Sequence, residues 1–169
     1  GDRVRAEINY CQRCGGAMVD RTIERKTRRS CPACGFIAFQ DPKVAAGVIA
    51  SNEKGHVLLM QRSHEPRKGF WSYPSGYVDS GEKVEDAAIR ETFEETEVQV
   101  VLDGLQGVYS ETGDRVVLVV YRGTIVKGEP KAGPESLAVG FFDASHLPEL
   151  AFPRDGRIID EWRAGHRVS

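Results

Sequence analysis

The sequence lacks the features that would indicate a membrane protein or an enzyme with a covalent nucleophile. No apolar run approaches the roughly 18 residues of a membrane-spanning helix, and no signal peptide is visible. The charges nearly balance, with 23 Lys and Arg against 25 Asp and Glu, so no strongly basic or acidic partner is indicated. The four histidines are scattered, without a Ser/His/Asp or Cys/His pattern or a glycine-rich phosphate loop. One ordinary domain and a small appendage fit the 169 residues.

Cysteine is absent after residue 34, and the four cysteines before that point form two Cys-x2-Cys pairs. The pairs are Cys11 with Cys14 and Cys31 with Cys34, and a glycine follows each pair. Two such turns about 16 residues apart are typical of a tetrahedral zinc site with four cysteine ligands. Two disulfides would suit a secreted protein, which nothing else here indicates, and a redox pair would not need duplication. We therefore predict a structural Zn²⁺ in a zinc ribbon over residues 1–40, because so short a segment cannot bury enough core to fold alone.

The segment between the cysteine pairs is basic and reads RTIERKTRRS. Two interpretations remain open, a nucleic-acid surface and a solvated hairpin. Aromatic residues that could stack on bases are sparse in it, so we favour the hairpin and expect no nucleic-acid partner.

A helix is predicted from Val84 to Thr96, because no Gly or Pro interrupts this stretch and acids lie near its start. Glu91, Glu94 and Glu95 stand three and four residues apart, so their carboxylates would share one face. The opposite face, which includes Phe93, would pack on the core. Like charges at this spacing repel by roughly 0.2–0.5 kcal/mol per pair. Mg²⁺ would turn the repulsion into coordination, because it prefers carboxylate oxygens; a solvated acidic face is the alternative.

The stretch around this helix resembles the Nudix box, G-x5-E-x7-R-E-U-x-E-E-x-G-U, where U is aliphatic. The matching residues are Gly76, Glu82, Arg90, Glu91, Glu94, Glu95 and Val98. Two positions depart from the pattern, with Thr92 in place of an aliphatic residue and Glu97 in place of the last Gly. A left-handed helix end is expected at Glu97, where a residue other than Gly costs on the order of 1 kcal/mol.

The resemblance implies an α/β fold over residues 41–169, a sandwich of the α/β/α type with a mixed, curved sheet between helices. It implies hydrolysis of nucleoside diphosphate derivatives with Mg²⁺ or Mn²⁺. The metal ligands implied are the Gly76 carbonyl, Glu91, Glu94 and Glu95. Arg90 would orient Glu91, and Glu82 would support the loop before the helix. The catalytic residues implied are Glu91, Arg90 and Glu135, with either Glu91 or Glu135 as general base.

Further candidates lie outside the box. Glu135 stands between a Gly/Pro loop and a predicted strand, so it is a candidate carboxylate for the metal site, and an ordinary loop acid is the alternative. The candidates for substrate contacts are Arg62, Trp71, Tyr73 and Phe152. The rings of Trp71, Tyr73 and Phe152 would lie against adenine or flavin, although Trp71 and Tyr73 would also suit core packing. Strands are predicted at 44–50, 57–61, 98–101, 105–110, 115–126 and 137–142, and a last helix at 155–163.

A zinc ribbon ahead of a Nudix box is similar to two groups of enzymes. NADH pyrophosphatases carry S-Q-P-W-P-F-P after the box, where this chain has YSETGD at 109–114. The other group is the ADP-ribose and FAD pyrophosphatases of plant plastids and their bacterial relatives, which the runs FWSYPSG at 70–76 and LAFP at 150–153 resemble. We therefore expect hydrolysis of ADP-ribose and/or FAD to AMP and a phosphorylated product. NADH or coenzyme A hydrolysis is one alternative, and a non-catalytic module that binds a nucleotide or an RNA end is another.

The resemblance also implies a small nucleotide as the partner, and a homodimer, since dimers are common in the family. The expected location is cytoplasmic, or the plastid stroma for a plant protein that has lost a transit peptide.

Overall fold

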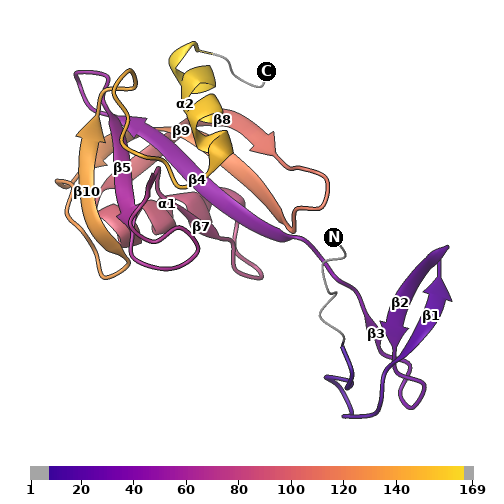
Figure 1. Ribbon diagram of the computed structural model, residues 1–169. Helices are drawn as coiled ribbons and strands as arrows, with labels where there is room; N and C mark the ends of the chain where they lie inside the picture. The colour runs from indigo at the N-terminus through magenta and orange to yellow at the C-terminus, as the bar shows by residue number, and fades with distance from the viewer. Residues whose placement is uncertain (1–7, 166–169) are drawn as a thin grey trace. The chain divides into compact units, whose positions relative to one another are not determined.

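In the computed structural model the chain divides into two compact units, residues 1–41 and residues 42–169 (Figure 1). The structure describes residues 8–165, so the outer ends of both predicted domains, 1–7 and 166–169, lie outside the described residues. Within the described part, no helix is both long and apolar enough to span a membrane.

The first unit is a small antiparallel sheet. Its strands are β1 (Val19–Ile23), β2 (Lys26–Ser30) and β3 (Ile37–Ala38), in the order β1-β2-β3. Glu24 and Arg25 both have positive φ, 48° and 68°, as a two-residue hairpin turn requires, so the hairpin predicted for the basic segment is present. In the described part of this unit, the buried apolar side chains are those of Cys11, Met18 and Cys31. Such a core is too small to fold without help.

The second unit is built on a seven-stranded mixed sheet. Its main path runs β10-β5-β4-β9-β8, and β4 and β9 are parallel while the other neighbours are antiparallel. The five strands of this path are β4 (Lys43–Ser51), β5 (Val57–Arg62), β8 (Gln99–Tyr109), β9 (Val116–Lys127) and β10 (Ser136–Phe142). The two helices are α1 (Val84–Thr96) and α2 (Pro153–Arg163).

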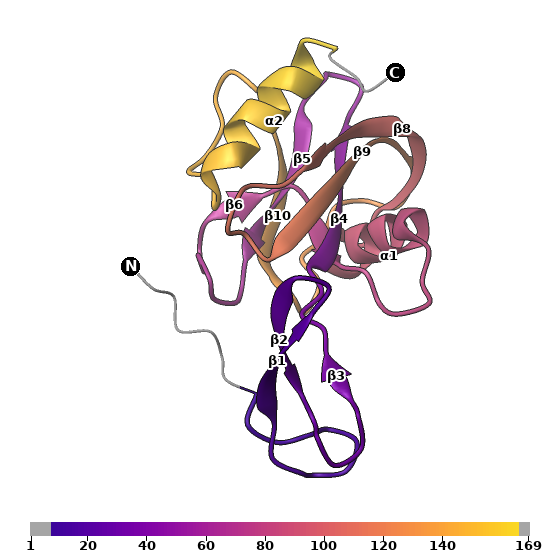
Figure 2. The same ribbon diagram turned by 90° about the vertical axis from the view of Figure 1, so that its right-hand side faces the viewer.

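The central strand β4 is apolar on both faces, which places a helix on each side of the sheet. Its sequence, KVAAGVIAS, is nearly continuous in small and branched apolar residues, as expected for a strand covered on both faces. Val48 packs in the cluster that contains Ala87 of α1, whereas Ile49 packs in the cluster that contains Ile158 of α2. Figures 1 and 2 show the two helices on opposite sides of the sheet. The predicted α/β/α arrangement is confirmed.

The sheet opens between β4 and β5, and two short strands enter the opening. Within residues 8–165, β4 and β5 pair only at Ser51 and Val57, beside their connecting turn. Farther along, β7 (Ser75–Tyr77) pairs with β4 and β6 (Trp71–Ser72) pairs with β5. The chain from β6 to β7 then leads into the loop before α1.

Two predictions about local structure need correction. Phe93 does not anchor α1 to the core, because it is 46% exposed. The helix instead buries Ala87, Ala88, Thr92 and Glu95, and the two alanines, which are small, pack in the core cluster against the sheet. The strands predicted at 98–101 and 105–110 are one bulged strand, β8, with an irregularity at Gly104 (φ 155°). Glu97 has φ 59°, the left-handed helix end expected from the sequence.

Candidate active site

Three carboxylates from two distant parts of the chain meet at one point. Glu91 and Glu95 come from α1, and Glu135 comes from the loop before β10; one oxygen of each lies within 4.8 Å of the others. Glu94, which the box also includes, is outside this group, since its side chain is 41% exposed and contacts Arg90 at 3.2 Å. The structure therefore brings together three of the four predicted carboxylates.

Glu95 is the most buried of the three, with 7% of its surface exposed. The backbone N–H of Ser75 donates to its Oε2 at 3.0 Å. The hydroxyl of Ser136 donates to the Glu95 carbonyl at 2.6 Å, which holds the Glu135 loop against the helix. Burial raises the pKa of Glu95 well above its ordinary value, and the neighbouring Glu91 and Glu135 charges raise it further.

Glu91 lies between the loop and an arginine. A Cβ on Gly76 would overlap the Glu91 carboxylate, so only glycine allows the backbone this close. On the other side, Arg90 Nη1 donates to Glu91 Oε1 at 2.9 Å. Burial raises the pKa of Glu91, although the Arg90 charge opposes the shift.

Arg90 fixes the loop to the helix. Its Nε and Nη2 donate to the two oxygens of Glu82 at 2.8 and 2.9 Å, and Nη2 also donates to the Tyr77 carbonyl at 3.1 Å. The Arg90 guanidinium and the backbone N–H of Asp79 lower the pKa of Glu82 to about 2. Glu82 is thus ionised at every physiological pH, and the paired charges give the loop a single orientation.

The cluster opens into a cavity of about 720 Å³, a size typical of small-molecule sites. Residues of β4, β5, β6, β7, β9, α1 and the start of α2 line it, together with residues of the connecting loops. Glu91, Glu95 and Glu135 line one part of it, whereas Ala45, Val116 and Leu118 give another part an apolar surface. The cavity can therefore hold a ligand with one strongly charged end and one flat apolar end.

Of the four predicted substrate residues, the cavity is lined by Arg62, Tyr73 and Phe152. Arg62 stacks on the ring of Phe152, with its guanidinium carbon 5.1 Å from the ring centre. Trp71 is not among the described residues that line the cavity, because its ring packs edge-on against Phe142 at 4.8 Å. Tyr73 is 1% exposed and belongs to the core, so its ring cannot stack on a base. The structure corrects the sequence interpretation of Trp71 and Tyr73 in this respect.

Sequence reasoning missed Asp155, a buried carboxyl that also lines the cavity. Asp155 is 2% exposed, and its carboxylate lies beside the Tyr73 hydroxyl. Burial raises its pKa to about 6, although Tyr73, Arg154 and the Phe152 backbone favour the ionised form. In sequence, an acid in the first turn of a helix indicates only a favourable interaction with the helix dipole, so nothing marked this residue.

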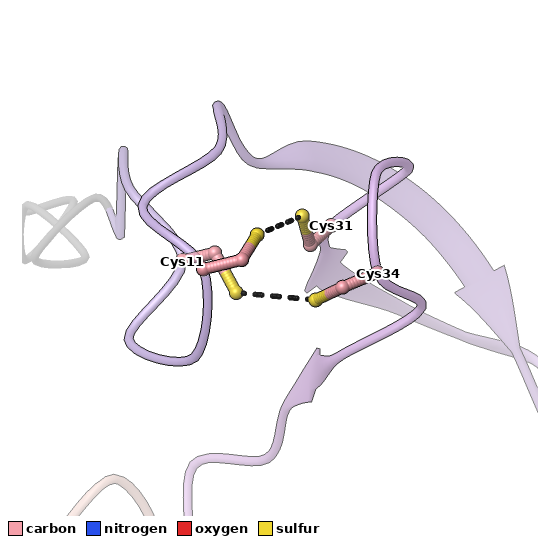
Figure 3. A group of neighbouring side chains, drawn as sticks. Cys11, Cys31 and Cys34 are labelled. Carbon is pink, nitrogen blue, oxygen red and sulfur yellow. Dashed lines mark hydrogen bonds between the residues drawn. The ribbon is translucent and has the colours of Figure 1, made fainter.

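The four cysteines form a second cluster, in the first unit. The Sγ atoms of Cys11 and Cys34 are 3.6 Å apart, and so are those of Cys14 and Cys31 (Figure 3). Four sulfurs around a metal at about 2.3 Å would be separated by about 3.8 Å in a regular tetrahedron. All four cysteines are free thiols, and backbone N–H groups of Arg13 and Gly16 face Cys11 and Cys14 at 3.4 Å. The cluster could therefore hold a zinc ion.

Residues 41–162 match the family described as NUDIX domain. The chain belongs to the NUDIX family. Among NUDIX relatives, an ADP-ribose pyrophosphatase of Methanocaldococcus jannaschii is 37% identical over 134 residues, which cover 75% of this chain and 78% of that protein. The NAD-capped RNA hydrolase NudC of Stutzerimonas stutzeri is 36% identical over 95 residues, but these cover 56% of this chain and 33% of that protein. The crystal structure of a NUDIX hydrolase from Nitrosomonas europaea is similar with a TM-score of 0.86 and 31% identity, over 95% of this chain and 96% of that chain.

The buried Asp155 of this NUDIX chain predicts a pH-dependent gain in stability for Asp155→Asn. A pKa of about 6 against an ordinary 3.8 means that ionising the folded protein costs up to about 3 kcal/mol more than ionising the unfolded chain. This cost is absent below about pH 4, develops between about pH 4 and 6 and is complete above it. We expect urea unfolding to show Asp155→Asn more stable than wild type by about 1–2 kcal/mol at pH 7.5 and equal to it at pH 4.

The matched control is Asp160→Asn, which changes an exposed acid of the same helix and should stay within about 0.5 kcal/mol of wild type at both pH values. A stability difference for Asp155→Asn that is the same at both pH values would contradict the assignment of a strained, ionised carboxylate.

Proposed function

We propose that this chain hydrolyses the diphosphate bond of nucleoside diphosphate derivatives, with ADP-ribose and/or FAD as substrate and AMP plus a phosphorylated product. The observation that carries the proposal is the gathering of Glu91, Glu95 and Glu135 at one end of a ligand-sized cavity. Membership in the NUDIX family supports it, and so does a relative named ADP-ribose pyrophosphatase that is 37% identical.

The carboxylate cluster fits Mg²⁺ or Mn²⁺ in its donor chemistry. Glu91 and Glu95 are buried acids with raised pKa values, and a divalent cation would offset both the burial and the repulsion between their charges. Carboxylate and carbonyl oxygens are the ligands that hard cations prefer. We assign the Gly76 carbonyl to the same set. Glu94 would join by leaving Arg90, which keeps its shorter contacts with Glu82.

The roles of the side chains follow from their contacts. Arg90 is a positioning residue, since it holds Oε1 of Glu91, and Glu91 lines the cavity. Glu91 and Glu135 are the candidates for the general base that takes a proton from the attacking water. Arg62, stacked on Phe152, offers a positive charge to the diphosphate. When bound, Mg²⁺ would polarise the phosphoryl group and neutralise charge on the diphosphate.

The first test of this function is Glu95→Gln, with Glu94→Gln beside it. The amide oxygen of the introduced glutamine retains an acceptor for the Ser75 N–H, so the fold should survive although Glu95 is buried. Loss of a negatively charged ligand should weaken the binding of Mn²⁺, which is measured by electron paramagnetic resonance. It should also lower turnover by on the order of 100-fold or more. Asp86→Asn, an exposed acid in the first turn of α1, is the matched control and should behave as wild type. Wild-type Mn²⁺ binding in both glutamine variants would refute the metal assignment.

The substrate is tested by kcat/KM for ADP-ribose, FAD, NADH and coenzyme A with Mg²⁺. Metal and diphosphate contacts are shared by all four, so selectivity must come from a few cavity contacts worth about 1–3 kcal/mol each. We expect ADP-ribose and FAD to exceed the other two. An advantage of about tenfold or more for NADH or coenzyme A would overturn the assignment of ADP-ribose or FAD as the substrate. Tight nucleotide binding without release of AMP from any compound would favour the non-catalytic module.

We also propose that the cysteine cluster holds one structural Zn²⁺, bound by Cys11, Cys14, Cys31 and Cys34. The 3.6 Å sulfur separations and the very small core of this unit support it. Metal analysis should find one zinc per chain. Cys14→Ser should unfold mainly residues 1–41, because this unit depends on the metal, while Thr22→Ser on exposed β1 should change nothing. A disulfide between any of these cysteines in the native protein would overturn the proposal.

The homodimer and the cytoplasmic location stay predictions.

A further inference from the structure

The basic hairpin of the first unit has two faces that differ in charge. In the antiparallel pairing of β1 and β2, Arg21 lies opposite Arg28, and Asp20 lies opposite Arg29. Residues opposite each other share a face and neighbours along a strand alternate, so each of these pairs occupies its own face. Arg29 Nη1 contacts Asp20 Oδ1 at 3.2 Å, so the charges on that face compensate each other.

The other face, which we call the basic face, consists of Arg21, Lys26 and Arg28. Within residues 8–41 the only side-chain ion pair is that of Arg29 with Asp20, so the basic face has no acidic partner there. Like charges directly opposite each other destabilise an antiparallel strand pair. Water weakens this repulsion at exposed side chains, so the charges alone would be compatible with an ordinary solvated surface.

An exposed aromatic ring distinguishes the basic face from an ordinary solvated surface. Phe39 follows β3, and the guanidinium carbon of Arg28 lies 4.8 Å from the centre of its ring. Phe39 is 54% exposed, so part of it stays open to solvent in spite of this contact. Aromatic residues are sparse within the basic segment itself, which was the reason to expect no nucleic-acid partner. The fold supplies the missing ring from outside that segment.

The combination of arginine side chains with an open ring limits the ligand chemistry. Positive side chains without acidic partners attract phosphates, and the planar fork of arginine can donate two hydrogen bonds to one phosphate. An aromatic ring and a guanidinium plane are both surfaces on which an unpaired base stacks. Lipid head groups would supply phosphates without a planar group, and a duplex would hide the faces of its bases. A single strand supplies both groups.

We propose that the basic face, together with Phe39, binds single-stranded nucleic acid. The three basic side chains contact phosphates, and a base stacks on the ring of Phe39. Such binding tolerates any sequence, because neither kind of contact reads the edge of a base. Three phosphate contacts predict that the Kd rises about 20-fold between 50 and 200 mM salt. The surface lies within the first unit, so this inference does not depend on the function proposed for the second.

The test measures, by fluorescence anisotropy, how the full chain with its native metal content binds a labelled, unstructured RNA of about 15 nucleotides. Arg21→Gln/Arg28→Gln should bind at least about tenfold more weakly at low salt and lose about two-thirds of the salt dependence. Phe39→Ala should bind at least about fivefold more weakly with unchanged salt dependence, because it removes stacking alone. The matched control, Lys127→Gln/Lys131→Gln, removes two exposed charges from the second unit and should stay within about twofold of wild type.

Binding of the RNA does not require hydrolysis, so its outcome is separate from that of the proposed function. Unchanged affinity in the folded arginine double variant overturns the inference. So does equal affinity for the corresponding duplex, or binding of phosphatidylserine vesicles without binding of the RNA. If the double variant fails to fold, Arg21→Gln alone, which changes an exposed side chain, should still weaken binding by at least about threefold. An unchanged Kd in that single variant overturns the inference as well.

Discussion

Burying two like charges side by side is the constraint on which the rest of this site depends. Glu91 and Glu95 stand one turn apart on the buried face of α1, where burial raises the pKa of both and the Glu91 charge raises that of Glu95 further. The chain compensates in part, with Arg90 on Glu91 and the Ser75 N–H on Glu95. The remaining repulsion would favour a divalent cation, because full compensation within the chain would remove the free energy that a cation could gain there.

The open sheet is what allows that burial. If β4 and β5 paired along their whole length, there would be no room for β6 and β7, and the Gly76 backbone would not reach Glu91. Gly76 can approach only because it has no side chain. The small residues Ala87 and Ala88 bring α1 close to the sheet on the same face. Backbone geometry and side-chain size thus work together, and the acidic residues alone would not form the site.

The elements of the fold and the carboxylates of α1 were predictable because their signals are local in sequence, whereas the arrangement of the elements was implied by the resemblance to the Nudix box. The uninterrupted run from Val84 to Thr96 indicated the helix bounds, and the apolar strands indicated the sheet. The orientation of Phe93 and the packing of Trp71 were not predictable, because they depend on which neighbours cover each ring after folding. Asp155 gave no signal in the sequence for the same reason, since its burial arises only when α2 packs against the sheet.

Buried acids lie at two places on the cavity wall. Burial raises the pKa of Glu91 and Glu95 in one part of it, and in another part burial raises the pKa of Asp155 to about 6. Ionising these carboxyl groups costs free energy in the folded protein, so each of them lowers the stability of the free chain at neutral pH. A divalent cation at Glu91 and Glu95 would offset that cost, so the burial that destabilises the free protein is also what would favour binding of the metal.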